Sequence, residues 1–371
     1  MQDFNHQDHN FNRLDDQASP QPQNQDQSQD FYPSRTGESH FRKNQHPWMW
    51  PAIIAVLVIV GIGLFWLHSA YNNAQNTFKK TYEEGSVNKT RNVASVINKD
   101  KPFSVLLMGT DTGALGRHEV GRTDTMILAS INPKRHTTYL TSIPRDTKVT
   151  VPGDSQPYEK VNAAYTIGGP STAVSTVQRL LNVPIDFYAI VNMGGLEKMV
   201  SAVNGVKVDP PLTFHYEQAN VVKGQETNLN GKAALAYSRM RHQDPEGDYG
   251  RQKRQRQVLQ KLLIKGMGIS SLPRYKQILA SLNGNLKTDV KFDDLVSIRA
   301  RYGIATHHIK SIGMRENDAT IDGIDYQVPT KDELIRISKK IRKSLGLSND
   351  RDLISNNYID NYPDADSSLS D

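Results

Sequence analysis

The chain has 371 residues, a formal net charge of +6 and no cysteine. Without thiols it can form no disulfide, no thiolate nucleophile and no cysteine-ligated zinc or iron–sulfur site. The positive charge alone is compatible with nucleic acid, a membrane surface or an anionic ligand, so the placement of the charges has to separate these classes.

Both ends of the chain have the composition of segments that do not fold. Residues 1–46 are rich in Gln, Asn, Asp and Ser and show no apolar periodicity. Residues 347–371 are acidic and also lack a core pattern. Such segments bury too little apolar surface to offset the entropy that is lost on ordering. We therefore predict a disordered tail at each end.

Residues 48–67, WMWPAIIAVLVIVGIGLFWL, contain no charged side chain. As a helix rising ~1.5 Å per residue they would span roughly 30 Å, the hydrocarbon thickness of a bilayer. Trp48, Trp50 and Trp66 lie at the two ends, where indole rings favour the membrane interface. A buried core helix would usually keep a polar face, and a cleaved signal peptide has a shorter apolar region close to the N-terminus. The sequence thus predicts one transmembrane helix.

The basic residues that flank this segment predict its orientation. Arg35, Arg42 and Lys43 precede it closely, whereas Lys79 and Lys80 follow it at a greater distance. This bias places the N-terminus in the cytoplasm and everything after the span outside the cell membrane. A location outside the cell removes nucleic acid from the expected partners of the folded part.

After the span we predict a polar, partly helical stalk at 68–98 and one folded domain at 100–346. Short apolar runs predict strands, and a period of 3.6 residues predicts helices. The predicted strands are 103–109, 124–132, 137–144 and 186–193. The predicted helices are 171–182, 194–205, 231–241, 248–267, 292–303 and 331–346. Strands interleaved with helices indicate an α/β domain with a mixed central sheet flanked by helices.

Charged residues lie at the ends of three predicted strands. The second and third strands are joined by the short turn PKRH, so they should be antiparallel neighbours. If the first strand is also antiparallel to the second, one edge of the sheet gathers Asp111, Arg122, Asp124, Arg145 and Asp146. Each of these alone is compatible with a solvated turn, but acids and bases gathered at one edge favour a divalent cation beside an anion. Mg²⁺ takes oxygen ligands, typically one or two carboxylates with substrate phosphate.

The helix predicted to begin at Asp248 combines a basic end with an apolar stripe. Arg251, Gln255, Val258 and Leu262 are spaced by four, three and four residues and therefore share one face. A guanidinium in the first turn of a buried face indicates a partly buried anion, which the helix N-terminus also attracts. The apolar half is compatible with a hydrophobic channel, but ordinary core packing is the preferred interpretation from sequence alone.

Further basic residues surround this helix end. Arg239 and Arg241 close the preceding helix, and Arg254 lies near the basic face. All of them are also compatible with ion pairs to neighbouring acids. We prefer anion binding for Arg239 and Arg241, and ion pairing or solvation on the outer face for Lys253 and Arg256. Several arginines around one anion favour a pyrophosphate.

Other motifs carry less information. The chain has no nucleophile elbow and no P-loop. Lys160 and Asn162, in KVNAAYTIGG, are further candidates for the site. His307 and His308 have no acid at ligand spacing, so we predict a structural role for them.

The motifs in their order resemble the LytR–CpsA–Psr family. They are LLMGTDTG, GRTDTMIL, SIPRDT, KVNAAY, LNGKAALAYSRMRH and GDYGRQKRQRQVL, and the resemblance covers roughly residues 100–270. It implies a phosphotransferase on the outer face of a Gram-positive cell membrane. Such proteins transfer an anionic glycopolymer, teichoic acid or capsular polysaccharide, from undecaprenyl pyrophosphate to peptidoglycan. The implied fold is an α/β domain in which the lipid tail enters a hydrophobic pocket.

The resemblance also implies roles for individual residues. Its motifs assign Mg²⁺ binding to Asp111 and Asp124, pyrophosphate binding to Arg145, Arg239, Arg241, Arg251 and Gln255, and orientation of arginines to Asp248. We add Arg122 to the pyrophosphate set and assign catalysis to Arg145, Asp146 and Arg251. Asp146 or a carboxylate of the metal site would accept the proton of the attacking hydroxyl. The Thr in GRTDT, where Ser is common in the family, keeps the hydroxyl.

Two other classes of function stay open at this point. A hydrolase that releases the glycan from the pyrophosphate with water would use the same site, so only its products separate it from a transferase. A non-catalytic, membrane-anchored regulator is the second alternative. The predicted topology argues against direct DNA binding by such a regulator, because the basic domain lies outside the membrane.

Overall fold

The computed structural model describes residues 49–79, 81–83, 87–110, 121–267, 278, 281, 283–348 and 362–364. The chain divides into two units, 1–60 and 61–371, and the second unit contains the folded domain. Helix α1, Met49–Phe78, begins in the first unit and ends in the second. None of the helices in the described part of the chain is both long enough and apolar enough to cross a membrane. The predicted N-terminal tail lies outside the described residues.

A six-stranded mixed sheet with the order β11-β6-β1-β2-β3-β12 forms the centre of the domain. Strand β2 is antiparallel to β1 and β3, whereas β6 is parallel to β1 and β12 is parallel to β3. The sequence predicted four of these strands: β1 (Phe103–Thr110), β2 (Thr123–Asn132), β3 (Thr137–Ile143) and β6 (Phe187–Asn192). It missed the edge strands β11 (Leu286–Thr288) and β12 (His308–Gly313), which are short or mostly exposed. The expected α/β domain with a mixed central sheet is confirmed.

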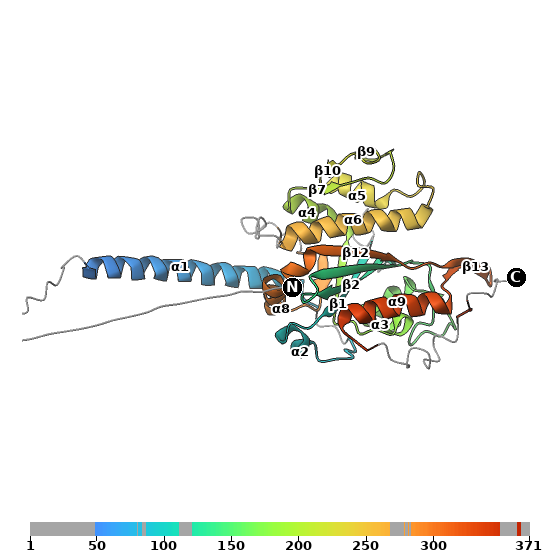
Figure 1. Cartoon of the computed structure of the whole chain (residues 1–371), viewed down its shortest axis with the longest axis horizontal. Coiled ribbons are helices and arrows are strands. Elements are labelled where there is room, and N and C mark those ends of the chain that lie inside the picture. Colours follow the sequence, from blue (N-terminus) through green and yellow to red (C-terminus); the bar gives the residue numbers. More distant parts are fainter. Residues whose placement is uncertain are drawn as a thin grey trace, which may run out of the picture. The chain divides into compact units, whose positions relative to one another are not determined.

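Helices cover both faces of this sheet, as Figure 1 shows. On one face lie α3 (Ala163–Leu181) and α9 (Lys331–Leu345). On the other lie α4 (Met193–Ala202), α5 (Gly231–Arg239) and α6 (Gly247–Met267). Alternate residues of β2 serve the two faces: Leu128 belongs to the core beneath α3 and α9, and Ile127 packs with Leu259 of α6. The central strands are apolar on both faces because both are covered.

Smaller elements complete the domain. They include the helices α2 (Val93–Asn98) and α8 (Phe292–Tyr302) and the 3₁₀ helix η2 (Gly303–Thr306). The sequence predicted α8, α2 lies in the segment predicted to be partly helical, and η2 was not predicted. The remaining strands pair in twos: β4 (Lys148–Val149) with β5 (Glu159–Lys160), β7 (Val206–Val208) with β10 (Thr227–Leu229), β8 (Phe214–Tyr216) with β9 (Ala219–Val221), and β13 (Asn317–Ile321) with β14 (Ile324–Val328). In α3 the backbone leaves helical geometry at Gly168 and Gly169, and regular helix resumes at Pro170. Within the predicted C-terminal tail, Tyr362 is buried and donates to Lys148 O at 2.8 Å.

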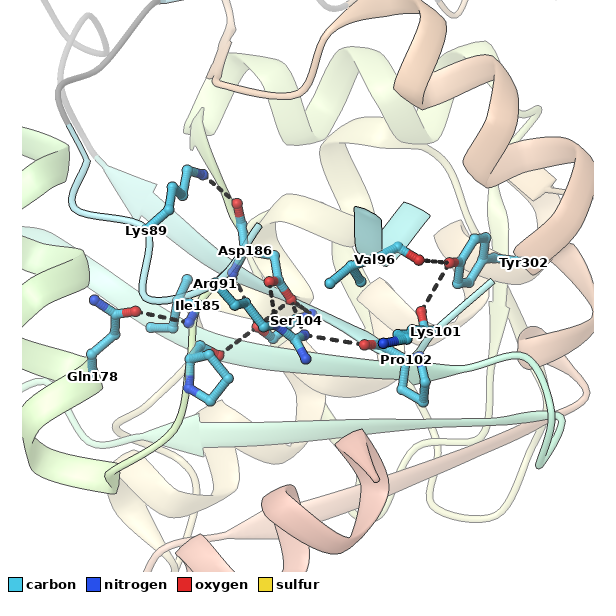
Figure 2. A network of polar contacts seen from close by, with 11 residues as sticks. Lys89, Arg91, Val96, Lys101, Pro102, Ser104, Gln178, Ile185, Asp186 and Tyr302 are labelled. Atoms are coloured by element: carbon cyan, nitrogen blue, oxygen red, sulfur yellow. Dashed lines mark hydrogen bonds and ion pairs between the residues drawn. The ribbon is translucent and has the colours of Figure 1, made fainter. Parts of the chain in front are cut away.

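A buried carboxylate connects the segment before the sheet to the sheet itself. Asp186 is fully buried, and Figure 2 shows the side chains that surround it. Arg91 Nε donates to Asp186 Oδ1 at 2.6 Å, and the backbone N–H of Ser104 donates to Oδ2 at 2.8 Å. Lys89 donates to the backbone oxygen of Asp186. The network fixes residues that the sequence analysis placed in the predicted stalk.

Replacing Asp186 by Ala should lower the free energy of unfolding by about 3 kcal/mol, because Arg91 would keep a largely buried charge without its partner. Urea unfolding followed by circular dichroism measures this loss. Glu226→Ala is the control, since Glu226 and its partner Lys207 are both exposed and surface pairs contribute little. Equal unfolding midpoints for the two variants would contradict the assigned role of the network.

Candidate active site

Four charged side chains meet where β2 begins and β3 ends. Arg145 Nη1 donates to Asp124 Oδ1 at 2.8 Å. Its Nε lies 3.4 Å from Asp146 Oδ2, and Lys160 Nζ lies 3.2 Å from Asp146 Oδ1. The antiparallel pairing of β1, β2 and β3 brings these residues together, as the sequence analysis expected. Asp111 lies outside the described residues.

A second group comes from the first turns of α6. Arg251 Nη2 lies 2.5 Å from Asp248 Oδ1 and donates to the backbone oxygen of Asp124 at 3.4 Å. Gln252 Nε2 donates to Asp248 Oδ2 at 2.8 Å. Asp248 is therefore held by Gln252 and in turn holds Arg251 toward the start of β2. Sequence reasoning missed Gln252, although its position four residues after Asp248 was the available signal.

The electrostatics of the two groups show that they share one site. Burial lowers the pKa of Arg251, and the nearby charges of Arg145 and Arg241 lower it further, against the carboxylates of Asp248 and Asp124. Burial also opposes the charge of Arg145, but the hydrogen bond to Asp124 and the charge of Asp146 outweigh it, so the pKa of Arg145 is raised. The carboxylates of Asp124, Asp146 and Asp248 pair with these arginines, and a bound anion would add to this compensation of buried positive charge.

The guanidinium of Arg251 has a donor to spare. Its Nε is buried and has no hydrogen-bond partner within the described ranges, whereas Arg145 Nε lies 3.4 Å from Asp146 Oδ2. A guanidinium can present two parallel N–H groups to a phosphate. The unused donor of Arg251 therefore fits a phosphate oxygen.

The other residues predicted for the site differ in their relation to Arg145 and Arg251. Arg239 and Gln255 border the same cavity as Arg251. Arg239 Nη1 also lies 3.3 Å from Glu217 Oε1, and Gln255 Nε2 donates weakly to a backbone oxygen at 3.4 Å. Arg241 is exposed, and only its charge reaches Arg251. Arg122 is exposed, and its positive charge acts against the rise in the pKa of Tyr326 that burial causes.

An apolar cavity of about 390 Å³ lies between the sheet and the helices α4, α5 and α6. Its apolar wall comes from Leu107, Ile127, Leu196, Met199, Leu259 and Leu262. Arg251 and Gln255 border it nearer the start of α6, and Leu262 lies roughly 16 Å further along that helix. The cavity is thus polar at one end and apolar along the rest.

This cavity corrects the preferred interpretation of the apolar stripe. Val258 is almost completely buried and belongs to a core cluster, but it also lines the cavity, and Leu262 lines it as well. The periodicity of a helix reports that one face is covered. It does not report whether neighbouring side chains or an open space lie opposite.

One further expectation for α6 was wrong. Arg256 is neither solvated nor ion-paired within the described structure, because its side chain is buried next to Ser142 of β3. Arg254 is fully buried, pairs with Asp244 and donates from Nε to Tyr237 O at 3.1 Å, so it forms one of the ion pairs that the sequence left open. Lys253 is exposed and pairs with Glu246, as expected. The face of α6 that was expected to be exposed is partly covered, because it packs on β3 and β12.

Replacing Gly250 by Ala should destabilise the protein by about 2 kcal/mol, because the added methyl group would overlap the carboxylate of Asp244 and displace it from Arg254. Gly266 lies in the same helix with open space around it, so Gly266→Ala should be neutral or stabilising by up to about 1 kcal/mol. Thermal unfolding of the two variants compares them directly. A loss of stability in both would point to helix propensity or another cause instead of Asp244.

The residues present fit a divalent cation in part. The described residues contain no group of three or more acidic or histidine side chains that could hold a metal. Asp124 uses Oδ1 for Arg145, and in the described structure nothing donates to its Oδ2. Mg²⁺ needs only one or two protein carboxylates when substrate phosphate and water complete its shell. Asp124 is therefore suitable as one ligand.

Comparisons with known proteins agree with this geometry. The LytR_cpsA_psr family model matches residues 65–343. A polyisoprenyl-teichoic acid--peptidoglycan teichoic acid transferase TagU from Enterococcus faecalis is 39% identical over 295 residues, covering 79% of this chain and 94% of that protein. The protein of the same name from Bacillus subtilis is 36% identical over 297 residues, covering 79% and 95%.

A solved structure extends the likeness to the fold. A crystal structure of a protein from Enterococcus faecalis, described as a transcriptional regulator, is 37% identical and superposes with a TM-score of 0.64. The match covers 72% of this chain and 97% of that one. The mixed sheet flanked by helices thus occurs in a known family. The chain belongs to the LytR_cpsA_psr family.

Proposed function

We propose that the protein is a phosphotransferase that moves an anionic glycopolymer from undecaprenyl pyrophosphate to peptidoglycan. The observation that carries this proposal is the cavity of about 390 Å³, apolar along its length and bordered at one end by Arg239, Arg251 and Gln255. A ligand with a long apolar tail and an anionic head fits such a cavity. The names of the related TagU proteins supply the class of polymer, teichoic acid, and the acceptor, peptidoglycan.

The residues of the site support an in-line transfer. A hydroxyl oxygen of peptidoglycan forms a bond to the phosphorus attached to the sugar, and the bond from that phosphorus to undecaprenyl phosphate breaks. The guanidinium groups of Arg145 and Arg251 stabilise the charge that develops on the phosphoryl oxygens, and the buried Nε of Arg251 has no other hydrogen-bond partner in the described structure. Asp146, held by Lys160 and Arg145, takes the proton of the attacking hydroxyl.

The same proposal includes Mg²⁺, with Asp124 as one ligand and Asp111, implied by the family motif, as another. When bound, the ion would neutralise phosphoryl oxygens and lower the barrier to displacement. Asp124 then has two functions, because its other oxygen orients Arg145. The choice between teichoic acid and capsular polysaccharide as cargo is part of the proposal, with teichoic acid favoured by the relatives.

We place the catalytic domain outside the cell membrane, anchored by residues 48–67 with the N-terminus in the cytoplasm. The charge-free sequence of that segment and its flanking bases are the reasons for this placement. Large apolar side chains along the described part of α1 support it, since Leu57, Ile59 and Phe65 are 64%, 68% and 71% exposed.

Product analysis tests the proposal. The purified full chain in detergent is supplied with Mg²⁺, a polyprenyl-pyrophosphate-linked glycan and peptidoglycan oligomers, and the products are read by mass spectrometry. A glycan–phosphate–peptidoglycan adduct is the expected product. Free glycan phosphate without an adduct would instead establish the hydrolase. Lipid binding without either product would leave a non-catalytic binding protein.

A further inference from the structure

A second, larger depression of about 1120 Å³ lies beside α6. We call it the basic groove, and we define it by Lys253 and Arg256 of α6, Arg315 and Glu316 after β12, and Arg336 and Lys340 of α9. None of these residues takes part in the catalytic scheme above. None of them lines the apolar cavity of about 390 Å³, which we call the lipid cavity. The groove is nearly three times as large as the lipid cavity.

Helix α6 separates the basic groove from the lipid cavity. Tyr249, Gln252, Lys253 and Arg256 line the groove, at positions three, four and seven residues after the first. The residues that line the lipid cavity begin at Arg251, two positions after Tyr249, which corresponds to roughly 200° around the helix. The two depressions therefore lie on opposite faces of one helix.

The groove carries more positive charge than its own acids can balance. Lys253 pairs with Glu246, and Arg336 pairs with Glu333. Five basic side chains line the groove, against two carboxyl groups, those of Glu246 and Glu316. Burial raises the pKa of Glu316 well above its usual range, and its Oε2 is buried without a hydrogen-bond partner in the described structure.

Three cations of the groove have no carboxylate partner among the residues that the structure describes: Arg256, Arg315 and Lys340. Arg256 is the most informative because it is only 6% exposed. Its Nη1 donates to the neutral Ser142 Oγ at 2.5 Å, and its buried Nε has no hydrogen-bond partner in the described part of the chain. Burial lowers its pKa to about 10. A guanidinium buried at this cost is expected to meet an anion.

The position of the groove relates it to the reaction site. Gln252 on the groove wall holds Asp248, which in turn holds Arg251. On the other wall, Thr147, the residue after Asp146, donates to Glu316 Oε1 at 2.7 Å. On two different elements, a residue that follows a site residue directly in sequence thus reaches the groove or its wall: Gln252 follows Arg251, and Thr147 follows Asp146. A substrate whose lipid lies in the cavity can place its opposite end in the groove.

We infer that the basic groove binds the phosphate-bearing chain of the glycopolymer, beyond the sugar that is transferred first. This rests on the proposed function for the identity of the polymer, but not for the presence of an anion site. A phosphodiester polymer carries one charge in each repeat, which matches several separated cations, whereas the glycan backbone of peptidoglycan carries none. The groove is also too large for a single phosphate.

Titration of the full chain with a short poly(glycerol phosphate) oligomer tests this inference. The double variant Arg315→Gln/Lys340→Gln removes two exposed cations of the groove and should weaken binding at least about tenfold, as the loss of charge-assisted hydrogen bonds predicts. Lys134→Gln/Lys223→Gln removes the same charge from exposed sites outside the groove and should bind like the wild type. Arg256→Gln should weaken binding as well, and unfolding curves show whether that variant is folded.

Two results would overturn the inference. Equal weakening by both double variants would mean that only net charge matters. Weakened binding of peptidoglycan oligomers, with polymer binding unchanged, would assign the groove to the acceptor. A parallel titration of wild type and Arg251→Ala with farnesyl pyrophosphate tests the donor site separately. Failure of that titration would count against the proposed function and leave the result for the groove intact.

Discussion

Replacing Arg251 by Ala should reduce the rate of transfer by at least about a hundredfold, the cost of removing a preorganised donor that stabilises developing charge. Arg251 combines a buried, unused Nε with a fixed orientation, because Asp248 holds its Nη2. Arg251→Lys keeps the charge but loses the planar fork, so it should recover only a small part of the activity. The rate of adduct formation with a polyprenyl-pyrophosphate donor is the measurement.

The matched control is Lys261→Ala. It removes one positive charge from the same helix at a position that lines neither the lipid cavity nor the basic groove. Its transfer rate should equal that of the wild type. Urea unfolding of Arg251→Ala separates lost chemistry from lost structure. A folded Arg251→Ala protein with a rate within a few fold of the wild type would remove Arg251 from the mechanism.

Replacing Leu262 by Trp should raise the KM for a long-chain polyprenyl donor by about tenfold or more. The indole would occupy space in a cavity of about 390 Å³ that the isoprenoid tail is expected to fill, and ~1.4 kcal/mol of lost binding corresponds to tenfold. A donor with a short, farnesyl tail should be affected much less. The ratio of KM values for the two donors is the readout, since a general defect in catalysis would change both equally.

Ile264→Trp provides the comparison for Leu262→Trp. Ile264 is exposed and lies two residues further along α6, so the same bulky side chain is added outside the cavity. This variant should keep the KM ratio of the wild type. Leu262→Trp should also remain stable, because it fills an existing space and does not overpack the core. Equal KM ratios in the two variants would mean that the lipid tail lies elsewhere.

The sequence was most informative where a periodic pattern and a charged residue occurred together. The alternation of strands and helices predicted β1, β2, β3 and β6, and the short turn before β3 predicted the antiparallel pairing that brings Arg145 next to Asp124. The same reasoning failed for short elements. Strand β12 is mostly exposed and lacks the apolar run that marked its neighbours.

The basic side chains of α6 show why contacts between distant parts of the chain could not be predicted from the sequence. The sequence gives no means to distinguish Arg254, buried against Asp244, from Arg251, held at the cavity. Arg256 was expected to be ion-paired or solvated on the outer face of the helix. It is buried because β3 passes beneath that face, and only the tertiary structure supplies this information.

Arg254 joins two helices that carry arginines of the site. Its guanidinium binds the backbone oxygens of Tyr237 and Met240, at the end of α5, while it remains part of α6. It therefore fixes the spacing between the two helices that carry Arg239 and Arg251. An anion that binds between these two helices would therefore hold both of them in place. Because it binds only the folded protein, the complex should melt at a higher temperature than the free protein.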